Sequence, residues 1–315
     1  MSGNMKIAIL GAGSIGSLIA AKLASSKLAQ VLVHARGEHA AKLALDGITI
    51  TGHQELKISP DAYEISIADV MVNDIFDGAA DYVLICSKAN QVEKLFEIAK
   101  RMCHIDTKVL VLSNGLGHVE KCKGTFGPHR TIAATTTHGA WRPSPGVVNW
   151  AGIGAINLGE LPFGANLTEI QDFVDLLEQS GLNPNLQPDG MAMIWSKILL
   201  NIAINPIAAI TGLSNGALLE NEMFETCVEV MLEGAKISRL EGITTLDDAT
   251  LIDNLRVVLQ ATSNNQCSML QDVRQGRDTE IQFLNRQIVD RAEKYGVSTP
   301  LNQLLSQLVE SITSY

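Results

Sequence analysis

The chain has 315 residues, of which 46% are hydrophobic and 18% are charged, and its formal net charge is −10. This composition predicts a folded protein long enough for two domains and excludes an intrinsically disordered chain. Because the charge is negative and no basic run interrupts it, nucleic acid and anionic membrane surfaces are not expected as the main partners.

Targeting signals and cysteine usage indicate a soluble cytoplasmic protein. The first residues, MSGNMKIAILG, lack the basic region and long apolar run of a secretory signal. The cysteines are odd in number, scattered and without a CxxC pair, as is typical of reduced thiols (86, 103, 122, 227 and 267). The most apolar stretch, 193–212, contains a lysine, two asparagines and a proline, which argues against a membrane span.

From residue 5 to about 160, short β-branched runs alternate with helical patterns. Strands are expected at 6–10, 31–35, 81–86, 108–113 and 130–137, and helices at 14–27, 90–101 and shortly after Gly117. Apolar strands separated by helices predict a mainly parallel sheet covered on both faces. Residues 47–52 and 56–60 predict a hairpin insertion, and 146–161 predict two more short strands.

After Thr168 the strand patterns stop. Residues 168–181 predict an amphipathic helix, and 182–190 have the proline, asparagine and glycine content of a linker. Further helices are expected at 190–210, 221–240, 248–275, 280–295 and 300–313, with glycines 242, 276 and 296 at helix ends and Thr299-Pro300 at a helix start. We therefore expect an α/β domain over 1–187 and an all-α domain over 188–315.

A glycine motif at the first strand-to-helix turn predicts a dinucleotide site. The turn reads Gly11-Ala12-Gly13-Ser14-Ile15-Gly16. Gly11 permits the tight turn, Gly13 lets the backbone approach a pyrophosphate, and Gly16 lets the helix pack close to the strand. The helix N-terminus offers N–H groups and a positive dipole end to phosphate. This favours a Rossmann-type domain, although glycines in an ordinary βα turn are the alternative.

The end of the second strand favours NADP. An NAD site usually has a carboxylate there for the ribose hydroxyl, but the sequence continues with Arg36 and has no carboxylate until Glu38. A guanidinium can pair with a 2′-phosphate through two hydrogen bonds. A solvated loop arginine is the alternative. Lys88 and Asn114 follow two other strands, where side chains could reach the same cofactor.

The apolar segment 193–212 carries three polar residues four positions apart, Lys197, Asn201 and Asn205. On a helix, residues four apart differ by only about 40° of rotation, so the three form one stripe. The stripe either faces a polar cleft or contains a lysine that reaches solvent from a core helix. Pro206 adds two alternatives, a kink in one helix or a new helix capped by Asn205.

A nicotinamide cofactor at the glycine motif could transfer a hydride to a carbonyl group of a substrate. Hydride addition to a carbonyl creates an alkoxide, which needs a proton donor or a fixed positive charge. All seven histidines lie in the first 138 residues, so Lys197 is the best cationic candidate in the helical half, while His118 and His138 remain open. A further polar cluster, Asn265, Ser268 and Asp272, is expected on one helical face, where Ser268 could donate to a substrate carboxylate. Glu280 follows, within a Thr279-x-x-Gln282 pattern that also fits a capping box.

Together these motifs resemble the ketopantoate reductase family. The resemblance spans nearly the whole chain and rests on the glycine motif, Ser87-Lys88 with Gln91, Asn114-Gly115, TTTHGA ending at Ala140, WSKILLNIAINPIAAITG, NGAL at 215–218, SMLQD at 268–272, TEI at 279–281 and GVSTPLN at 296–302. The sequence departs from the family at Gln282, Arg286 and Gly139. These departures leave open which 2-oxo acid is the substrate, although the reaction class implied by the resemblance is unaffected.

The resemblance implies reduction of ketopantoate to pantoate with NADPH, in pantothenate and coenzyme A biosynthesis. It implies that Lys197 is the general acid and that the substrate is bound by Asn201, Asn205, Asn215 and Ser268. Asn265 and Asn114 are two further candidates for substrate binding. It also implies that the cofactor site includes Arg36, Lys88, Gln91, Asn114, Ala140 and Glu280 beside the glycine motif. No metal is expected, and a homodimer is one expected assembly. The alternatives are a dehydrogenase for another 2-oxo or 3-hydroxy acid and a non-catalytic NADP-sensing protein.

Overall fold

The computed structural model describes residues 5–67 and 76–313, and the chain divides into two compact units. The α/β unit comprises Met1–Ser113 and Gly117–Met191, and the helical unit comprises Asn114–Leu116 and Ala192–Tyr315. Three residues from the first part of the chain therefore belong to the helical unit. A single boundary at residue 187 had been expected from the sequence, whereas the α/β unit continues to Met191.

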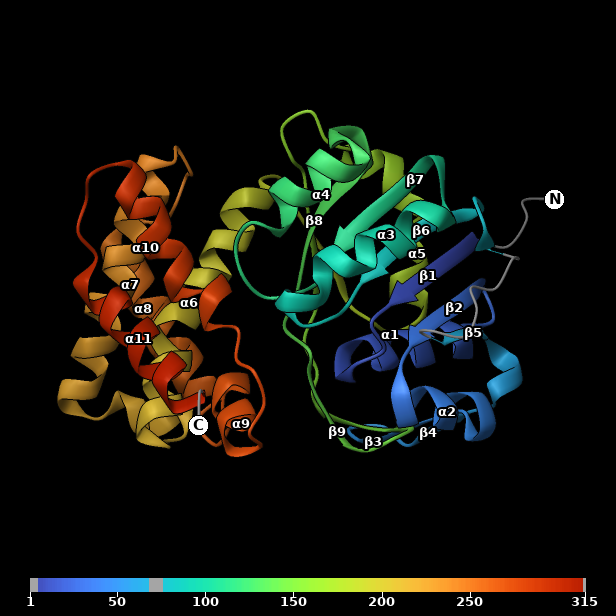
Figure 1. Cartoon of the computed structure of the whole chain (residues 1–315), viewed down its shortest axis with the longest axis horizontal. Helices are drawn as coiled ribbons and strands as arrows, with labels where there is room; N and C mark the ends of the chain where they lie inside the picture. The colour runs from blue at the N-terminus through green and yellow to red at the C-terminus, as the bar shows by residue number, and fades with distance from the viewer. Residues whose placement is uncertain (1–4, 68–75, 314–315) are drawn as a thin grey trace. The chain divides into compact units, whose positions relative to one another are not determined.

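The main sheet of the α/β unit is mostly parallel, as expected (Figure 1). Within the described residues it has eight strands in the order β12-β11-β8-β7-β6-β1-β2-β5. The parallel strands are β5 (Glu64–Ile67), β2 (Ala29–Ala35), β1 (Met5–Leu10), β6 (Ala80–Ile85), β7 (Cys103–Val111) and β8 (Thr131–Thr136). β11 (Ile156–Gly159) runs antiparallel to β8, and β12 (Pro184–Gln187) runs parallel to β11.

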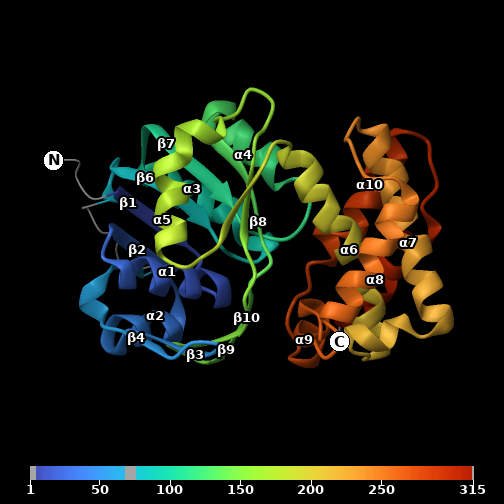
Figure 2. The same cartoon turned by 180° about the vertical axis from the view of Figure 1, so that it is seen from behind.

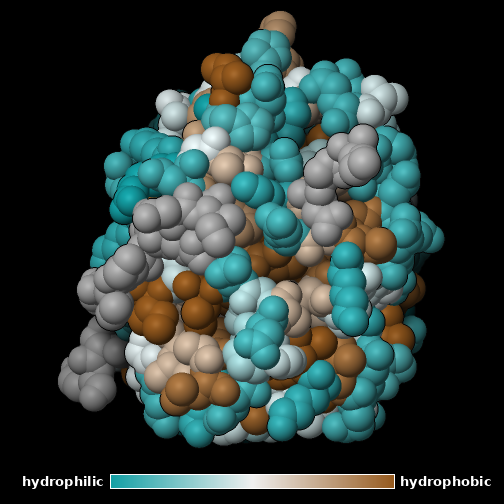
Figure 3. Space-filling model, turned by 90° about the vertical axis from the view of Figure 1, so that its right-hand side faces the viewer, coloured by the Kyte–Doolittle hydropathy of each residue, from teal (hydrophilic) through white to brown (hydrophobic). Residues whose placement is uncertain are grey.

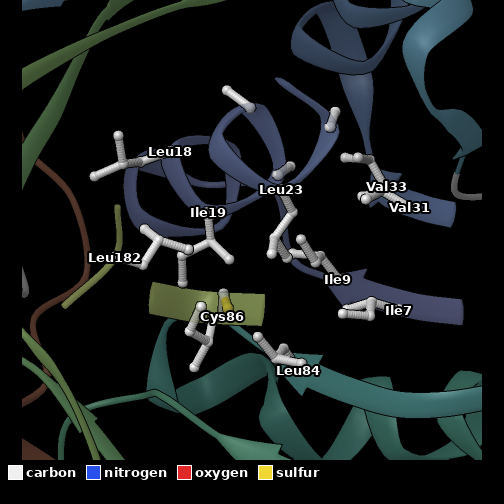
Figure 4. Close-up of a cluster of buried hydrophobic side chains, with 14 of the residues drawn as sticks. Ile7, Ile9, Leu18, Ile19, Leu23, Val31, Val33, Leu84, Cys86 and Leu182 are labelled. Atoms are coloured by element: carbon white, nitrogen blue, oxygen red, sulfur yellow. The ribbon is translucent and has the colours of Figure 1, made fainter. Parts of the chain in front are cut away.

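Helices cover both faces of this sheet because its strands are apolar on both sides. Along β1, Ile7 and Ile9 belong to one core cluster, whereas Ala8 and Leu10 belong to the other. The first cluster lies under α1 (Ser14–Ser26), α2 (Gly37–Asp46) and α5 (Gln171–Gln179), and the second under α3 (Val92–Met102) and α4 (His118–Phe126) (Figures 1 and 2). Figure 4 shows side chains from α1, β1, β2 and β6 meeting in the first cluster.

A second, smaller sheet packs against α1. Its order is β4-β3-β10-β9, formed by β4 (Leu56–Ile58), β3 (Ile48–Gly52), β10 (Val147–Gly152) and β9 (Gly139–Ser144). The expected hairpin β3–β4 is confirmed, and so are the two expected strands at 146–161, although β10 and β11 join different sheets. Val148 and Trp150 of β10 are buried in the same core cluster as α1.

The helical unit contains α6 (Gly190–Thr211), α7 (Asn221–Leu240), α8 (Asp248–Ala261), α9 (Ser268–Arg274), α10 (Asn285–Lys294) and α11 (Pro300–Thr313). The expected α/β plus all-α fold class is confirmed. Glycines 242, 276 and 296 follow helix ends with positive φ angles of 77°, 59° and 62°, as the sequence predicted.

Several local predictions were wrong. The expected linker at 182–190 contains strand β12, which pairs with β11, so strand structure does not stop after Thr168. The expected single helix over 248–275 is two helices separated by residues 262–267. α2 and β5 were not predicted.

Helix α6 is the one helix among the described residues with the length and hydropathy to cross a membrane. However, 67% of its most apolar window is buried within the structure, as in the core helix of a globular protein. On the face of the α/β unit seen in Figure 3, hydrophilic residues predominate and hydrophobic residues lie in patches between them.

Candidate active site

The glycine loop of the α/β unit has the shape that a pyrophosphate requires. Gly11 has φ = +91°, and a Cβ atom there would lie 2.9 Å from the Ser87 Cβ. A Cβ on Gly16 would lie 2.4 Å from the Gly11 carbonyl oxygen, so α1 can approach the strand only with glycine at this position. A Cβ on Gly13 would meet nothing nearer than the Cys86 oxygen at 3.9 Å. Two glycines are thus required by packing, and the third leaves open space beside the N-terminus of α1.

This loop lies at the point where the order of strands along the sheet reverses. β1 is flanked by β2 on one side and β6 on the other, and the chain reaches these neighbours by connections that run to opposite sides. The backbone N–H groups of Gly11 and Ala12 donate to the His34 carbonyl at the end of β2, at 3.1 and 3.2 Å. Open α/β sheets bind ligands at such a switch point, beyond the carboxyl ends of the strands. The residues present therefore fit a dinucleotide.

Other cofactor candidates of the α/β unit lie beyond neighbouring strands. Arg36 is exposed just after β2, and its Nη1 donates to Gln91 Oε1 at 3.5 Å. Lys88 precedes a short 3₁₀ turn (Ala89–Gln91) that follows β6. The Ser113 hydroxyl donates to the Ser87 carbonyl at 2.5 Å, which joins the loops after β7 and β6. The structure thus brings Arg36 and Gln91 together at this edge.

Ala140 lies elsewhere in the unit, on the smaller sheet. It sits in β9 opposite Trp150 of β10 and is partly buried against the core cluster around α1. The adjacent Gly139 faces Gly152, and a Cβ there would lie 3.3 Å from the Gly152 nitrogen. A methyl group at this position would therefore be tight in this chain.

His138 is held by backbone atoms on both ring nitrogens. Its Nδ1 accepts from the Gly154 N–H at 3.0 Å, so Nε2 carries the proton and donates to the Leu182 carbonyl at 3.1 Å. Burial lowers the pKa of His138, which favours the neutral ring. Because both ring nitrogens are bonded to backbone atoms, the structure disfavours His138 as an alternative to Lys197 for the proton donor.

In the helical unit, Lys197, Asn201 and Asn205 lie on one uninterrupted helix, α6, and so form a stripe on one face. Lys197 and Asn201 are partly buried, whereas Asn205 is only 6% exposed. Burial lowers the pKa of Lys197 from 10.5 to about 8, and the Glu280 carboxylate opposes this shift by favouring the ammonium. A lysine with this pKa is mostly charged at neutral pH but can release its proton readily.

Glu280 also binds Asn114. The Asn114 Nδ2 donates to Glu280 Oε2 at 3.0 Å, between residues 166 positions apart. The backbone supports this contact, because the Leu116 N–H donates to the Phe283 carbonyl at 2.9 Å. Gly115 fits against Phe283 only because it has no side chain, since a Cβ would lie 2.6 Å from the Phe283 Cβ. The structure thus brings Asn114, Glu280 and Lys197 together within the helical unit.

Two helix caps that the sequence offered as structural alternatives, at Thr279 and at Asn205, do not form. The Thr279 capping box does not form: Glu280 precedes a 3₁₀ turn (Ile281–Phe283) without a side-chain cap, and Gln282 instead donates to Glu310. Asn205 does not cap a new helix either, because α6 continues through Pro206.

The remaining substrate candidates differ in their surroundings. Asn215 is 7% exposed, and its Nδ2 donates to Thr262 Oγ1 at 2.9 Å while its backbone N–H binds the Asn265 carbonyl. Ser268 is exposed and begins α9. Asn265 lies in the loop before this helix, so the prediction of one helical face for Asn265, Ser268 and Asp272 was wrong. Asp272 is buried and pairs with Arg277 at 2.8 Å.

Cys267, for which no role was predicted, connects α9 to α6. Its thiol caps α9 by accepting from the Leu270 N–H at 3.4 Å and donates to the Asn205 carbonyl at 3.6 Å. The thiol thus links the helix that begins at Ser268 to the stripe of α6. A small polar residue directly before a helix start was the one available signal. Within the described residues all five cysteines are free, and no cluster that could hold a metal is found.

Comparison with protein families gives matches over most of the chain. The family described as ketopantoate reductase PanE/ApbA matches residues 7–162, and its C-terminal counterpart matches residues 189–313. A 2-dehydropantoate 2-reductase from Pyrococcus horikoshii is 35% identical over 308 residues, covering 98% of this chain and 97% of the relative. A 2-dehydropantoate 2-reductase from Vibrio cholerae is 30% identical over 311 residues, covering 98% of both.

Solved structures with a similar fold also match almost the whole chain. D-mandelate dehydrogenase, in a ternary structure with NADH and anilino(oxo)acetate, matches with a TM-score of 0.89 at 26% identity, covering 98% of this chain and 99% of the other. A PanE/ApbA family ketopantoate reductase from Ralstonia eutropha matches with a TM-score of 0.85 at 25% identity and the same coverage. The chain belongs to the ketopantoate reductase family.

Proposed function

We propose that this protein reduces ketopantoate to pantoate with NADPH in the cytoplasm, as a step of pantothenate and coenzyme A biosynthesis. The observation that carries the proposal is the trio in the helical unit, in which a lysine of lowered pKa, Lys197, lies with Glu280 and Asn114. The similar proteins from Pyrococcus horikoshii and Vibrio cholerae are named 2-dehydropantoate 2-reductases, which supports ketopantoate as the substrate. The five free thiols support a reducing compartment.

In this proposal NADPH, when bound, supplies a hydride from nicotinamide C4 to the C2 ketone of the substrate. Lys197 donates a proton to the oxygen that becomes the new hydroxyl, and its charge stabilises the negative charge that develops there. The Glu280 carboxylate favours the protonated form of Lys197. Asn201, Asn205 and Ser268 hold the carboxylate and hydroxyl groups of the substrate through neutral donors.

The test is NADPH consumption with a panel of 2-oxo acids that includes ketopantoate. The expected result is the highest kcat/KM with ketopantoate. A higher kcat/KM with another 2-oxo acid would overturn the substrate assignment, and turnover of 3-hydroxy acids with NAD would indicate a different dehydrogenase. Nucleotide binding without turnover of any acid would indicate a sensing protein.

The cofactor preference depends on Arg36, which is exposed at the end of β2 and can reach a 2′-phosphate. The variant Arg36→Ala is expected to weaken NADPH binding by about tenfold or more while leaving NADH binding nearly unchanged, because only NADPH carries the 2′-phosphate. Isothermal titration with both nucleotides measures this difference. A wild-type protein that binds NADH more tightly would overturn the assignment of NADPH.

A second candidate is reduction of an aromatic 2-oxo acid with NADH. It is favoured by the similarity to the D-mandelate dehydrogenase structure, which contains NADH. The exposed Glu38, in the first turn of α2, could bind a ribose hydroxyl. Phenylglyoxylate in the panel above, measured with each nucleotide, separates the two candidates.

A further inference from the structure

Pro206 lies inside α6 and leaves one helix carbonyl without its usual donor. In an α-helix the N–H of residue 206 would bind the carbonyl of Ile202, but proline has no N–H. The structure supplies another donor, the side-chain Nδ2 of Asn285, at 2.9 Å from the Ile202 oxygen. Asn285 is fully buried at the start of α10. Its amide therefore replaces the hydrogen bond that Pro206 cannot make.

A buried network fixes this amide in place. Asn285 Nδ2 also donates to Asn302 Oδ1 at 2.9 Å, and Asn302 in turn donates to the Val230 carbonyl at 3.1 Å and to Glu233 at 2.9 Å. Glu233 accepts from the backbone N–H of Leu301 at 3.1 Å and so caps the start of α11. The amide of Asn285 is thus tied to α7 and α11 as well as to α6.

The orientation of the Asn285 amide is set by what it donates. Its Oδ1 is buried and has no hydrogen-bond partner among the described residues, while both bonds of Nδ2 go to buried oxygens. A side chain that served only to fill space could be apolar at lower cost, since burying an unpaired carbonyl oxygen is unfavourable. The donor to the Ile202 carbonyl is therefore the distinctive feature of this position.

The bonded carbonyl lies within the polar stripe. Ile202 follows Asn201 directly and precedes Asn205, and Lys197 lies just over one turn earlier on the same helix. A helix that lost its hydrogen bond at this turn could bend or unwind between the two asparagines. Such a change would alter the alignment of Asn201 and Asn205 with Lys197.

We propose that Asn285 is a positioning residue for the reduction. It holds α6 straight enough across Pro206 for the stripe to present Lys197, Asn201 and Asn205 to one substrate. This inference rests on the proposed function, because it assigns a role in that same site. The residue acts through α6 and not through contact with the substrate.

A double-substitution cycle tests the inference. Asn285→Leu removes the donor while keeping the branched side-chain shape, and Pro206→Ala restores a backbone N–H that can bind the Ile202 carbonyl. Asn285→Leu alone is expected to raise the KM for the 2-oxo acid about tenfold with a smaller change in kcat, and to leave the Kd of the nucleotide unchanged. In the Pro206→Ala background the same substitution is expected to change KM by less than about threefold.

Glu233→Gln is the matched control, because it alters the end of the network that caps α11, keeps an amide oxygen that can accept from Asn302, and leaves the donor from Asn285 to the Ile202 carbonyl in place. It is expected to lower the thermal unfolding midpoint and leave KM unchanged. If Asn285→Leu does not fold, the cycle is run with Asn285→Ser, and folding of Asn285→Leu only with Pro206→Ala would support the inference.

Equal changes of KM in both backgrounds would overturn the inference, and so would unchanged kinetics in a folded Asn285→Leu variant. These outcomes presuppose a wild-type protein that turns over a 2-oxo acid. A wild-type protein that reduces none would overturn the proposed function itself, and this role for Asn285 with it.

Discussion

Lys197 illustrates how the surroundings of a single side chain determine its chemistry. Burial disfavours the ammonium and lowers its pKa to about 8, while the Glu280 carboxylate prevents a larger shift. The result is a lysine that is charged at neutral pH yet has a pKa near the working range of a general acid. Glu280 is itself bound by Asn114, so the carboxylate that raises the Lys197 pKa is held by a residue 166 positions away.

Replacing Lys197 should separate catalysis from nucleotide binding. Lys197→Ala is expected to lower kcat by about 100-fold or more, because the proton donor is lost, while the nucleotide still binds to the α/β unit. Steady-state kinetics and a nucleotide titration measure the two effects. The exposed Lys236 on α7 provides the control, since Lys236→Ala should leave both unchanged. Full turnover by Lys197→Ala would contradict the assignment.

The pH dependence of turnover should report the same group. The rate of reduction is expected to fall above about pH 8, as Lys197 loses its proton. Glu280→Gln keeps an acceptor for Asn114 but removes the charge that raises the Lys197 pKa, so the falling limb should move to lower pH. A pH profile of kcat for both proteins measures the shift. A limb that stays in place, or moves to higher pH, would contradict the pairing of Lys197 with Glu280.

At the scale of elements, the strand-to-helix turn after β1 combines packing and binding in six residues. Gly11 and Gly16 have no room for a Cβ, whereas Gly13 has room that a methyl group would fill. The same turn therefore contains positions where glycine is required for folding and one where it is available for a ligand.

Two matched substitutions distinguish these positions. Gly16→Ala is expected to destabilise the α/β unit strongly, because its Cβ would lie 2.4 Å from the Gly11 oxygen and α1 would have to move. Gly13→Ala should leave the thermal unfolding midpoint nearly unchanged but weaken nucleotide binding about tenfold or more, because the methyl group would enter the pyrophosphate space. A Gly13→Ala variant with normal nucleotide affinity would refute this placement of the pyrophosphate.

Elements with a strong local pattern could be predicted from the sequence, and elements defined by distant partners could not. The strand before Gly11 and the apolar helix around Lys197 were predicted because their periodicity is local. Strand β12 was missed because Pro184 and its asparagine neighbours are typical of a linker, and only pairing with β11 makes the segment extended. Asn285 could not be assigned a role, because its partner Ile202 lies 83 positions away.

At the scale of the whole α/β unit, one buried histidine joins elements that are far apart in the chain. His39 of α2 accepts from the Gly146 N–H at 2.9 Å, between β9 and β10, and its Nε2 lies 3.0 Å from the Ser17 hydroxyl of α1. That hydroxyl donates to the Ala12 carbonyl in the glycine loop at 3.2 Å. Because Nδ1 accepts, the ring must be neutral, with its proton on Nε2. The glycine loop and the smaller sheet thus share one neutral imidazole.

Protonation of this histidine should destabilise the fold. Burial, and secondarily Arg142, lower the His39 pKa from 6.5 to about 4, while a bond to the Ala12 backbone opposes the shift. Between these two values the unfolded chain binds more protons than the folded one, so the free energy of unfolding should fall as the pH is lowered through this window, by up to roughly 3 kcal/mol. Urea unfolding at several pH values measures the slope.

The control for this prediction is the exposed His53. His53→Gln should keep the slope, whereas His39→Gln should reduce it. Part of the slope should persist in His39→Gln, because burial lowers the pKa of His138 in the same direction. An unchanged slope in His39→Gln would contradict the predicted role of His39.

The assignment of residues Asn114–Leu116 to the helical unit has a consequence for attempts to divide the protein. A fragment that begins at Ala192 would lack the short piece that satisfies the Phe283 carbonyl and the Glu280 carboxylate. It would also expose the surface of Phe283 against which Gly115 fits. The helical unit is therefore not an independent module that a gene fusion or a truncation can transfer intact. Any exchange of its substrate specificity with a relative must carry the Asn114–Leu116 tripeptide along with the C-terminal sequence.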